Sequence, residues 1–269
     1  MSQQTKIIKL ENRALLALKG ADKKSFLQAI ITNDIENLNA DTPLYAALLT
    51  PQGKYLFDFI LSQDSEAETI FIDCEAERKD TLKNRLTMYK LRADVSIADV
   101  SENYDIWSVI DGEEGFVDPR HTGLGRRAYL KKGQKPNGLE AEYGDYDKLR
   151  LQLAIPDGAR DIEVEKRPIL EARFEALNGV NFTKGCYVGQ EVTARMKHRN
   201  AVRKQMYAIK LAGNAPEFGT LIYSGDKKAG HILSSLGKQA MALIKNEYID
   251  SDAPLTIDGL AIELIKPKS

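Results

Sequence analysis

The alternation of apolar and polar positions divides the chain into two stretches of different character. Up to about residue 200, apolar runs with a strand-like period alternate with segments whose apolar residues recur at helical spacing. Beyond Val202 the runs become short and are separated by glycine and proline turns. The pattern therefore predicts an α+β region over residues 1–204, built as two interleaved subdomains, and a small β-barrel over residues 205–269.

The first stretch predicts a largely antiparallel sheet with helices packed against it. Apolar runs typical of strands lie at residues 7–18, 44–50, 54–62, 69–73 and 104–110. Apolar residues at helical spacing predict helices after Asp22, around Leu82 to Tyr89, and over residues 143–153. Residues 111–125 are expected to form a loop, and the charged residues 157–167 a solvated connection.

Composition and charge are those of an ordinary soluble protein. Of 269 residues, 43% are hydrophobic and 29% are charged, and no apolar stretch approaches the length of about 20 residues needed to cross a bilayer. The N-terminal sequence lacks the order of a secretory signal, so we expect a cytoplasmic protein without a membrane partner. The formal net charge of -1 does not favour a chain that coats nucleic acid through its bulk charge.

Cysteine usage limits the metal chemistry. The chain has two cysteines, Cys74 and Cys186, which cannot form a four-cysteine zinc or iron–sulfur site by themselves. Cys74 follows the apolar run Ile70–Ile72 and is expected in the core, because free cysteine is often buried. We assign no metal ligands, and we expect Cys186 to act alone or to share a ligand with a partner protein.

The segment Lys184 to Glu191, with the sequence KGCYVGQE, carries the candidate chemistry. It joins an extended segment to a helix-compatible one, which would place Cys186 near a helix N-terminus that favours the thiolate. The ammonium of Lys184 would lower the thiol pKa further if it faces the sulfur. Gly185 and Gly189 allow tight turns and leave room for a ligand to approach the backbone. Gln190 and Glu191 offer groups suited to a heterocycle, and we take Cys186 and Lys184 as candidate catalytic residues.

This octapeptide resembles the signature of YgfZ-type proteins and of the related mitochondrial late-acting iron–sulfur assembly factors. Weaker similarities to the same family lie at residues 26–35, at 45–54 with Asp58, and at 147–150. The resemblance implies an aminomethyltransferase-like, folate-binding α+β fold with ferredoxin-like αβ layers and a C-terminal barrel. It also implies that tetrahydrofolate binds in a central channel, as in the glycine-cleavage T-protein.

Six residues are candidates for contacting that folate: Asp58, Arg150, Tyr187, Gln190, Glu191 and Arg195. Asp58 lies on an apolar strand and would need a hydrogen-bond donor, either a pterin N–H or the nearby backbone of the protein. The guanidinium of Arg150 could bind the glutamate tail of folate, or it could form a structural ion pair within the protein. The two alternatives have equal weight. Both alternatives stay open for each residue.

The leading hypothesis is a folate-binding accessory factor for iron–sulfur cluster assembly or repair and for iron–sulfur-dependent tRNA modification. Its expected partners are assembly factors or client proteins. Whether it turns over a substrate is left open. One alternative is an aminomethyltransferase that transfers a one-carbon unit to tetrahydrofolate, although T-proteins lack the cysteine motif. Another is a tRNA-binding module that uses the basic stretch after the motif, which contains Arg195, Lys197, His198, Arg199, Arg203 and Lys204.

Overall fold

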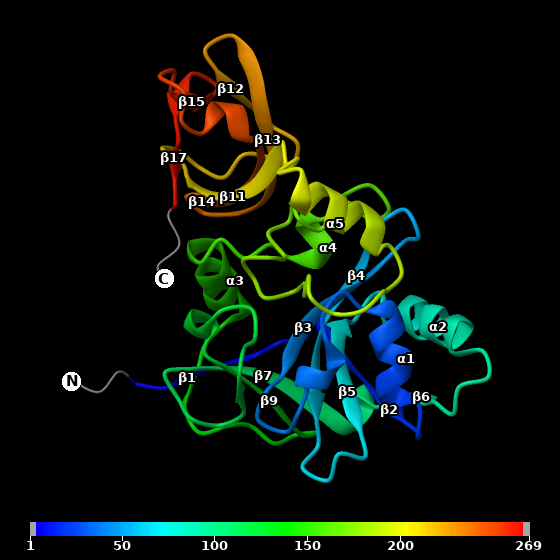
Figure 1. The fold of residues 1–269 in the computed structure, drawn as a ribbon. Helices are drawn as coiled ribbons and strands as arrows, with labels where there is room; N and C mark the ends of the chain where they lie inside the picture. The colour runs from blue at the N-terminus through cyan, green and yellow to red at the C-terminus, as the bar shows by residue number, and fades with distance from the viewer. Residues whose placement is uncertain (1–3, 266–269) are drawn as a thin grey trace.

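The computed structural model describes residues 4–265 and contains three β-sheets (Figure 1). The first sheet is antiparallel, and helices α1 and α2 supply Phe26, Leu27, Leu82 and Leu86 to the core on one of its faces. Its strands, in spatial order, are β3 (Leu44–Leu49), β4 (Tyr55–Gln63), β5 (Ile70–Glu75), β2 (Arg13–Lys19) and β6 (Ser96–Asp99). The two helices are α1 (Lys23–Ile30) and α2 (Lys79–Lys90).

The second sheet lies beside the first and is followed along the chain by three helices. Its strand order is β10 (Leu139–Glu140), β1 (Lys6–Lys9), β7 (Tyr104–Ile110), β9 (Arg126–Lys131) and β8 (Phe116–Val117). The pairing of β1 with β10 is parallel, and the other pairings are antiparallel. The helices are α3 (Tyr143–Gln152), α4 (Gly158–Asp161) and α5 (Gln190–His198).

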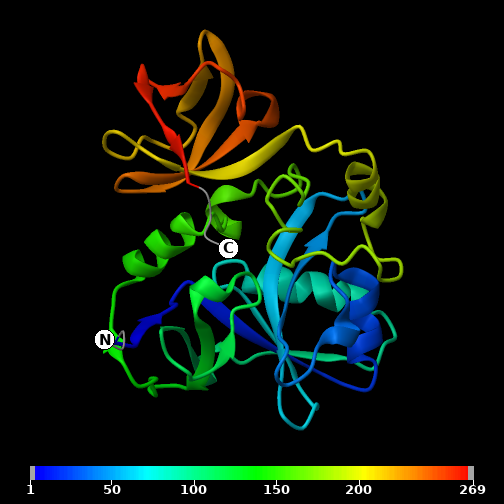
Figure 2. The ribbon, with the colours of Figure 1, turned by 60° about the vertical axis from the view of Figure 1, so that its left-hand side comes forward.

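The third sheet forms the C-terminal barrel, seen above the other two in Figure 2. Its strands are β11 (Lys204–Lys210), β12 (Leu221–Ser224), β13 (Lys227–Leu236), β14 (Gln239–Lys245), β15 (Leu255–Ile257), β16 (Leu260–Ala261) and β17 (Glu263–Leu264). Strands β16 and β17 form the two edges of the sheet and are separated in sequence by Ile262. The sheet therefore nearly closes on itself.

The prediction of one strand over residues 7–18 was wrong, because this apolar run supplies one strand to each of two sheets. A tight turn at residues 11 and 12 separates β1 from β2, and the Arg13 N–H donates to the Leu10 carbonyl (3.1 Å). The Leu10 N–H donates to the Ile106 carbonyl, so the run leaves the second sheet at this point. This short connection brings Arg13 to the boundary between the two sheets.

The structures predicted for two polar stretches were also wrong. Residues 111–125 contain strand β8 and a 3-10 turn at Thr122–Leu124, rather than a continuous loop. Residues 157–167 are not merely a solvated connection, because Asp161 is 2% exposed. Its carboxylate accepts hydrogen bonds from Arg150 and from the Ser234 N–H of the barrel (2.8 Å). A carboxylate with charged and backbone partners can be buried at moderate cost.

A buried ion network joins the first sheet to the second, and we call it the central ion network: Arg13, Asp73, Asp118, Arg120 and Arg127. Arg127 on β9 is 1% exposed and donates to Asp73 on β5 (2.6 Å) and to Asp118 (3.2 Å). Arg13 on β2 donates to the other oxygen of Asp73 (2.6 Å). Burial by itself raises the pKa of Asp73, but Arg127 and Arg13 outweigh this and hold the pKa below its ordinary value.

We predict that Asp73→Asn destabilises the protein by about 3–5 kcal/mol, because it leaves two buried guanidinium groups without their shared anion. The wild type should also lose stability as the pH falls below 3.8, the ordinary aspartate pKa, because the folded-state pKa values of Asp73 and Asp118 are lowered. Urea unfolding at several pH values measures both effects.

The matched control is Glu140→Gln, which removes one partner of the exposed Lys135–Glu140 pair. That variant should change stability by no more than about 0.5 kcal/mol. An Asp73→Asn protein with wild-type stability and an unchanged acid profile would show that the network does not hold the sheets together.

Candidate functional site

Cys186 lies at the surface of the protein, in the irregular segment that precedes the turn into α5. Its side chain is exposed, and it precedes the first helical residue, Gln190, by four positions. The other cysteine, Cys74, is buried on β5, and burial raises the pKa of its thiol to about 12. Cys186 is therefore the thiol of this chain that a partner or reagent can reach.

Lys184 holds the motif against the C-terminal end of α1 and does not offer its ammonium to the thiol. Its Nζ donates to the carbonyls of Gln28, Ile31 and Asn33, each at 2.8 Å. An ammonium has three N–H donors, so these bonds use all of them. Burial lowers the pKa of Lys184 to about 8. The expectation that this ammonium activates Cys186 is therefore wrong, and its role is to position the loop.

Further contacts anchor the loop on both sides of Lys184. The Asn181 N–H donates to the Thr32 carbonyl, and the Val188 N–H donates to the Ala29 carbonyl (3.1 Å). The Lys184 ammonium also lies 5.0 Å from the centre of the buried Tyr187 ring. Such a cation–π contact favours the charged lysine. Cys186 is thus an exposed residue between fixed neighbours.

Of the two glycines of the motif, Gly189 packs against the protein and does not leave space for a ligand. Gly189 has φ 82°, which favours glycine, and a Cβ at this position would lie 2.5 Å from the Thr50 carbonyl oxygen. On the other side Gly53, with φ 73°, has its own Cβ position 2.8 Å from the Gly189 oxygen. The hairpin turn after β3 and the start of α5 are therefore in direct backbone contact. Gly185, in contrast, borders open space.

The remaining predicted residues of the motif region do not converge with Asp58. Tyr187 is buried, and burial raises its pKa to about 12. Glu191 and Arg195 lie on the exposed side of α5 and form an ion pair at 3.8 Å, with side-chain exposures of 88% and 52%. Gln190 is the first residue of that helix. These four residues surround the base of α5 and do not form the wall of a central channel.

Asp58 points to the centre of the molecule, where other groups already occupy its carboxylate. The hydroxyls of Tyr55 (2.6 Å) and Tyr45 (3.1 Å) donate to its two oxygens. Gly158 abuts the same carboxylate, since a Cβ there would lie 1.9 Å from Asp58 Oδ1. The partners of Asp58 therefore come from within the protein, but they are side-chain hydroxyls and not the backbone groups that were expected.

Arg150 is committed to a structural ion pair. Its guanidinium donates to Asp147 (2.5 Å), to Asp161 (3.1 Å) and to Ser234 Oγ of the barrel (2.7 Å). Its side chain is 3% exposed. The proposed contact with the glutamate tail of folate is therefore not supported, because the two aspartates already balance the charge of Arg150.

The space around Asp58 is too small for a pterin. Asp58 and Arg150 line a central pocket of about 30 Å³, which the side chains of Arg13, Arg120 and Arg127 help to fill. Ligand pockets usually have volumes of several hundred Å³. Two larger cavities, of about 680 and 790 Å³, lie elsewhere, and none of the six predicted folate contacts lines either one. The residues predicted for folate therefore do not fit it.

Sequence reasoning missed the central ion network, which fills the position expected for a ligand. Arg120 donates to Asp118 (2.7 Å) and to the Tyr146 hydroxyl (2.8 Å), and Arg127 also donates to that hydroxyl (3.1 Å). One feature of the sequence indicates a buried charge: Asp73 carries a carboxylate directly after the apolar run Ile70–Ile72. Its arginine partners are distant in sequence.

Within residues 4–265, no group of three or more histidine, cysteine, aspartate and glutamate side chains is arranged to hold a metal ion. The helices of this described range include none that combines the length and apolar character of a membrane span.

Comparison with solved structures identifies the architecture. The aminomethyltransferase T of the glycine cleavage system from Bartonella henselae superposes with a TM-score of 0.76, covering 98% of this chain and 85% of that one. The fold is that of an aminomethyltransferase T. This confirms the predicted α+β fold with a C-terminal barrel. The two sequences are 14% identical, so this likeness concerns the fold alone.

Sequence comparisons find a different group of relatives. Residues 203–269 match the family model described as the C-terminal beta-barrel domain of CAF17. The chain is 29% identical to the mitochondrial iron–sulfur cluster assembly factor IBA57 of Mus musculus, over 96% of this chain and 82% of that protein. For the Homo sapiens protein of the same name the identity is 27%, over 90% of this chain and 78% of that one.

We predict that iodoacetamide modifies one cysteine in the native protein. Cys186 should react rapidly because it is exposed, whereas Cys74 should react after unfolding because its thiol is buried and its pKa is raised to about 12. Intact mass spectrometry with and without urea measures the number of adducts. Rapid modification of both cysteines without urea would contradict this placement.

We predict that Lys184→Met destabilises the protein by about 2–3 kcal/mol, because three carbonyls, two of them in buried hydrogen bonds, lose their donor. The matched control is Lys197→Met on α5, which breaks an exposed pair with Glu175 and should cost no more than about 0.5 kcal/mol. Urea unfolding compares the two variants. Equal stability of both would show that the lysine of the motif does not anchor the loop.

Proposed function

We propose that this protein is an accessory factor in iron–sulfur cluster assembly and that Cys186 is its contact with the cluster or with a partner protein. The observation that carries the proposal is the similarity, over most of the chain, to proteins named iron–sulfur cluster assembly factor IBA57. The position of Cys186 agrees with it, because this thiol is exposed on an anchored loop.

The chemistry that the site offers is that of a single thiolate ligand. A thiolate binds iron well, but one thiolate cannot hold a cluster that needs four ligands. Cys74 does not supply a second one, because its thiol is buried with a pKa of about 12. The cluster is therefore cargo, with its other ligands supplied by a second protein. The anchoring by Lys184 keeps the thiol presented at the surface.

The basic stretch after the motif suits an acidic partner surface. Arg195 and Lys197 are paired with Glu191 and Glu175. His198, Arg199, Arg203 and Lys204 form no ion pair within residues 4–265. Positive groups beside an exposed thiol favour the approach of an acidic protein or of an anionic cluster complex. Iron–sulfur enzymes that modify tRNA would be clients of such a factor, without direct contact between this protein and tRNA.

The proposed function does not require tetrahydrofolate. The residues predicted to hold it are dispersed, and the pocket at Asp58 has a volume of about 30 Å³. The aminomethyltransferase alternative needs the same pocket to admit both folate and an aminomethyl donor, so the filled centre argues against it as well.

We predict that Cys186→Ala fails to restore iron–sulfur enzyme activity in a cell that lacks this protein. Cys74→Ala should restore activity to at least about half of the wild-type level, because it removes a core side chain at moderate cost and leaves the exposed thiol in place. Aconitase-type activity and immunoblots for both variants measure the outcome. Full restoration by Cys186→Ala at wild-type abundance would refute the role of the thiol.

A further inference from the structure

Two cavities form one continuous groove along the boundary between the first and second sheets. Their volumes are about 790 and 680 Å³, and both are lined by Asp41 and Val117, where they meet. Sites for small molecules usually have volumes of about 300–1,000 Å³, so the joined groove is larger than one such site and favours an elongated occupant. We call it the edge groove. Its second part reaches Phe182 and Thr183, directly before the motif that carries Cys186.

The edge groove borders an edge strand of each sheet, and that of the first sheet is already covered. This strand is β3, against which residues 32 and 33 lie. Thr32 exchanges hydrogen bonds with the backbone of Ala47, at 3.0 and 2.8 Å. Asn33 Nδ2 donates to the Tyr45 carbonyl at 2.8 Å. The β3 edge therefore has little hydrogen-bonding capacity left for a second chain.

The edge strand of the second sheet, β8, is open at Val117. The Asp118 N–H donates to the Gly125 carbonyl (3.0 Å), and Val117 is the register partner of Arg126 on β9. Hydrogen-bonded and non-hydrogen-bonded pairs alternate along an antiparallel ladder, so Val117 directs its N–H and C=O away from β9. The residue is 40% exposed. An exposed edge of this kind is where an extended peptide adds to a sheet as a further strand.

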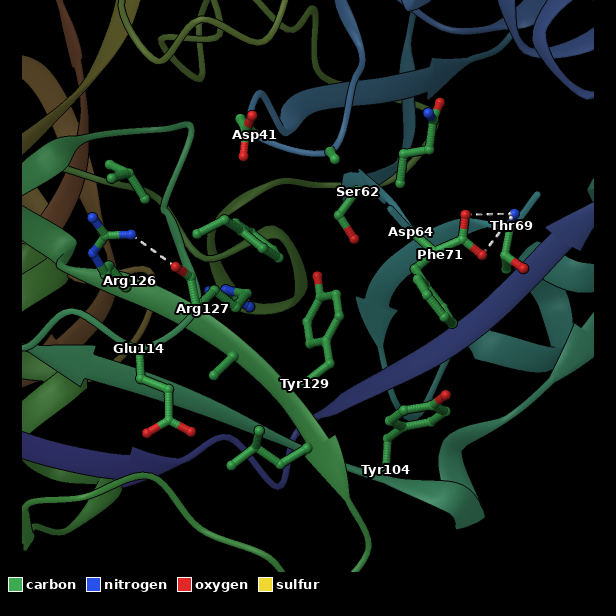
Figure 3. A pocket seen from close by; sticks show the side chains of 17 residues that line it. Asp41, Ser62, Asp64, Thr69, Phe71, Tyr104, Glu114, Arg126, Arg127 and Tyr129 are labelled. Atoms are coloured by element: carbon green, nitrogen blue, oxygen red, sulfur yellow. Dashed lines mark hydrogen bonds between the residues drawn. The ribbon is translucent and has the colours of Figure 1, made fainter. Parts of the chain in front are cut away.

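Aromatic side chains line the larger part of the edge groove (Figure 3). The ring of Phe71 lies 5.8 Å from that of Tyr104 and 6.2 Å from that of Tyr129. The ring of Phe116, on β8 itself, lies 5.3 Å from that of Tyr129. The four rings are partly buried, so they keep surface for apolar side chains and for the alkyl stems of lysine and arginine.

The charges along the edge groove that lack ion-pair partners are mainly negative. Asp41, Asp64 and Glu114 line it and form no ion pair within residues 4–265. Arg126 contributes one guanidinium, and the charge of Arg127 is already balanced within the central ion network. A groove with a net negative charge favours a positively charged occupant.

We propose that the edge groove binds an extended, positively charged segment of the partner protein that meets Cys186, and that this segment pairs with β8 at Val117 as an added strand. Alternate side chains of a strand point to opposite faces. Apolar side chains of the segment therefore pack on the rings, while its lysine or arginine side chains reach the carboxylates. The proposal rests on the proposed function, because it assigns the segment to the partner of the thiol.

The test is a fluorescence-anisotropy titration of the full-length protein with a labelled peptide of about eight residues, in which lysine alternates with valine and tyrosine. We expect saturable binding of this lysine peptide with a Kd of about 10–500 µM. The peptide with glutamate in place of each lysine should bind at least about ten-fold more weakly, because the groove repels its charge. Equal affinity for both peptides, or no saturable binding of the lysine peptide, would refute the proposal.

A matched pair of variants at one position tests the added strand. Val117→Pro removes the outward N–H, and a strand edge whose N–H points away from the sheet tolerates proline. Val117→Thr keeps both the N–H and the branched shape. We expect Val117→Pro to weaken binding of the lysine peptide about five- to ten-fold and Val117→Thr to leave it nearly unchanged. Equal, wild-type affinity of the two folded variants would show that the segment does not pair with β8 and would overturn the proposal.

A double variant, Asp41→Asn with Glu114→Gln, changes two exposed side chains and keeps the test valid if Val117→Pro is unstable. It should weaken binding of the lysine peptide about ten-fold and reduce the discrimination against the glutamate peptide, because it removes two negative charges. The control is Glu247→Gln, an exposed carboxylate of the barrel, which should bind like the wild type. Wild-type binding in the double variant would contradict the proposal.

The Cys186→Ala variant separates this proposal from the proposed function. It should bind the lysine peptide like the wild type, because Cys186 is not among the residues that line the groove. Restoration of iron–sulfur enzyme activity by Cys186→Ala, with peptide binding intact, would refute the role of the thiol and leave the groove as a binding site. Failure of the wild type to bind the lysine peptide, with Cys186→Ala inactive in cells, would refute the groove alone.

Discussion

The position of the two N-terminal sheets relative to each other depends on the buried guanidinium of Arg127. It bridges Asp73 of the first sheet and Asp118 of the second-sheet region, and Arg13 completes the charge balance of Asp73. Each of these ions would be costly to bury alone. Their mutual pairing makes burial acceptable for one arrangement of the strands, so the network specifies how the sheets meet. The short connection at residues 10–12 brings Arg13 to this boundary.

This network also determines where chemistry can occur. The sequence resemblance implies a ligand at the centre, but arginine side chains leave a pocket of about 30 Å³ there. The accessible functional groups consequently lie at the periphery. Cys186 is exposed in the segment that precedes α5. One fold can therefore support different functions at different sites on its surface.

The motif combines an anchor with an exposed reactive group. Three hydrogen bonds to carbonyls offset the cost of burying the Lys184 ammonium. Gly189 allows close contact with the hairpin turn at Gly53. Neither residue acts on the thiol directly. Both fix the backbone on either side of Cys186, which reduces the conformational entropy that a partner protein must remove when it binds there.

The sequence by itself determined the α+β class, the change to short strands after Val202, and the burial of Cys74, because these follow from local periodicity and composition. It also identified the octapeptide around Cys186. The tertiary structure decided which groups meet. Lys184 turned toward α1, Arg150 toward Asp147 and Asp161, and Asp58 toward two tyrosines. These partners are buried polar groups, and a buried charge takes the partner that folding brings near it, at sequence separations that no local pattern encodes.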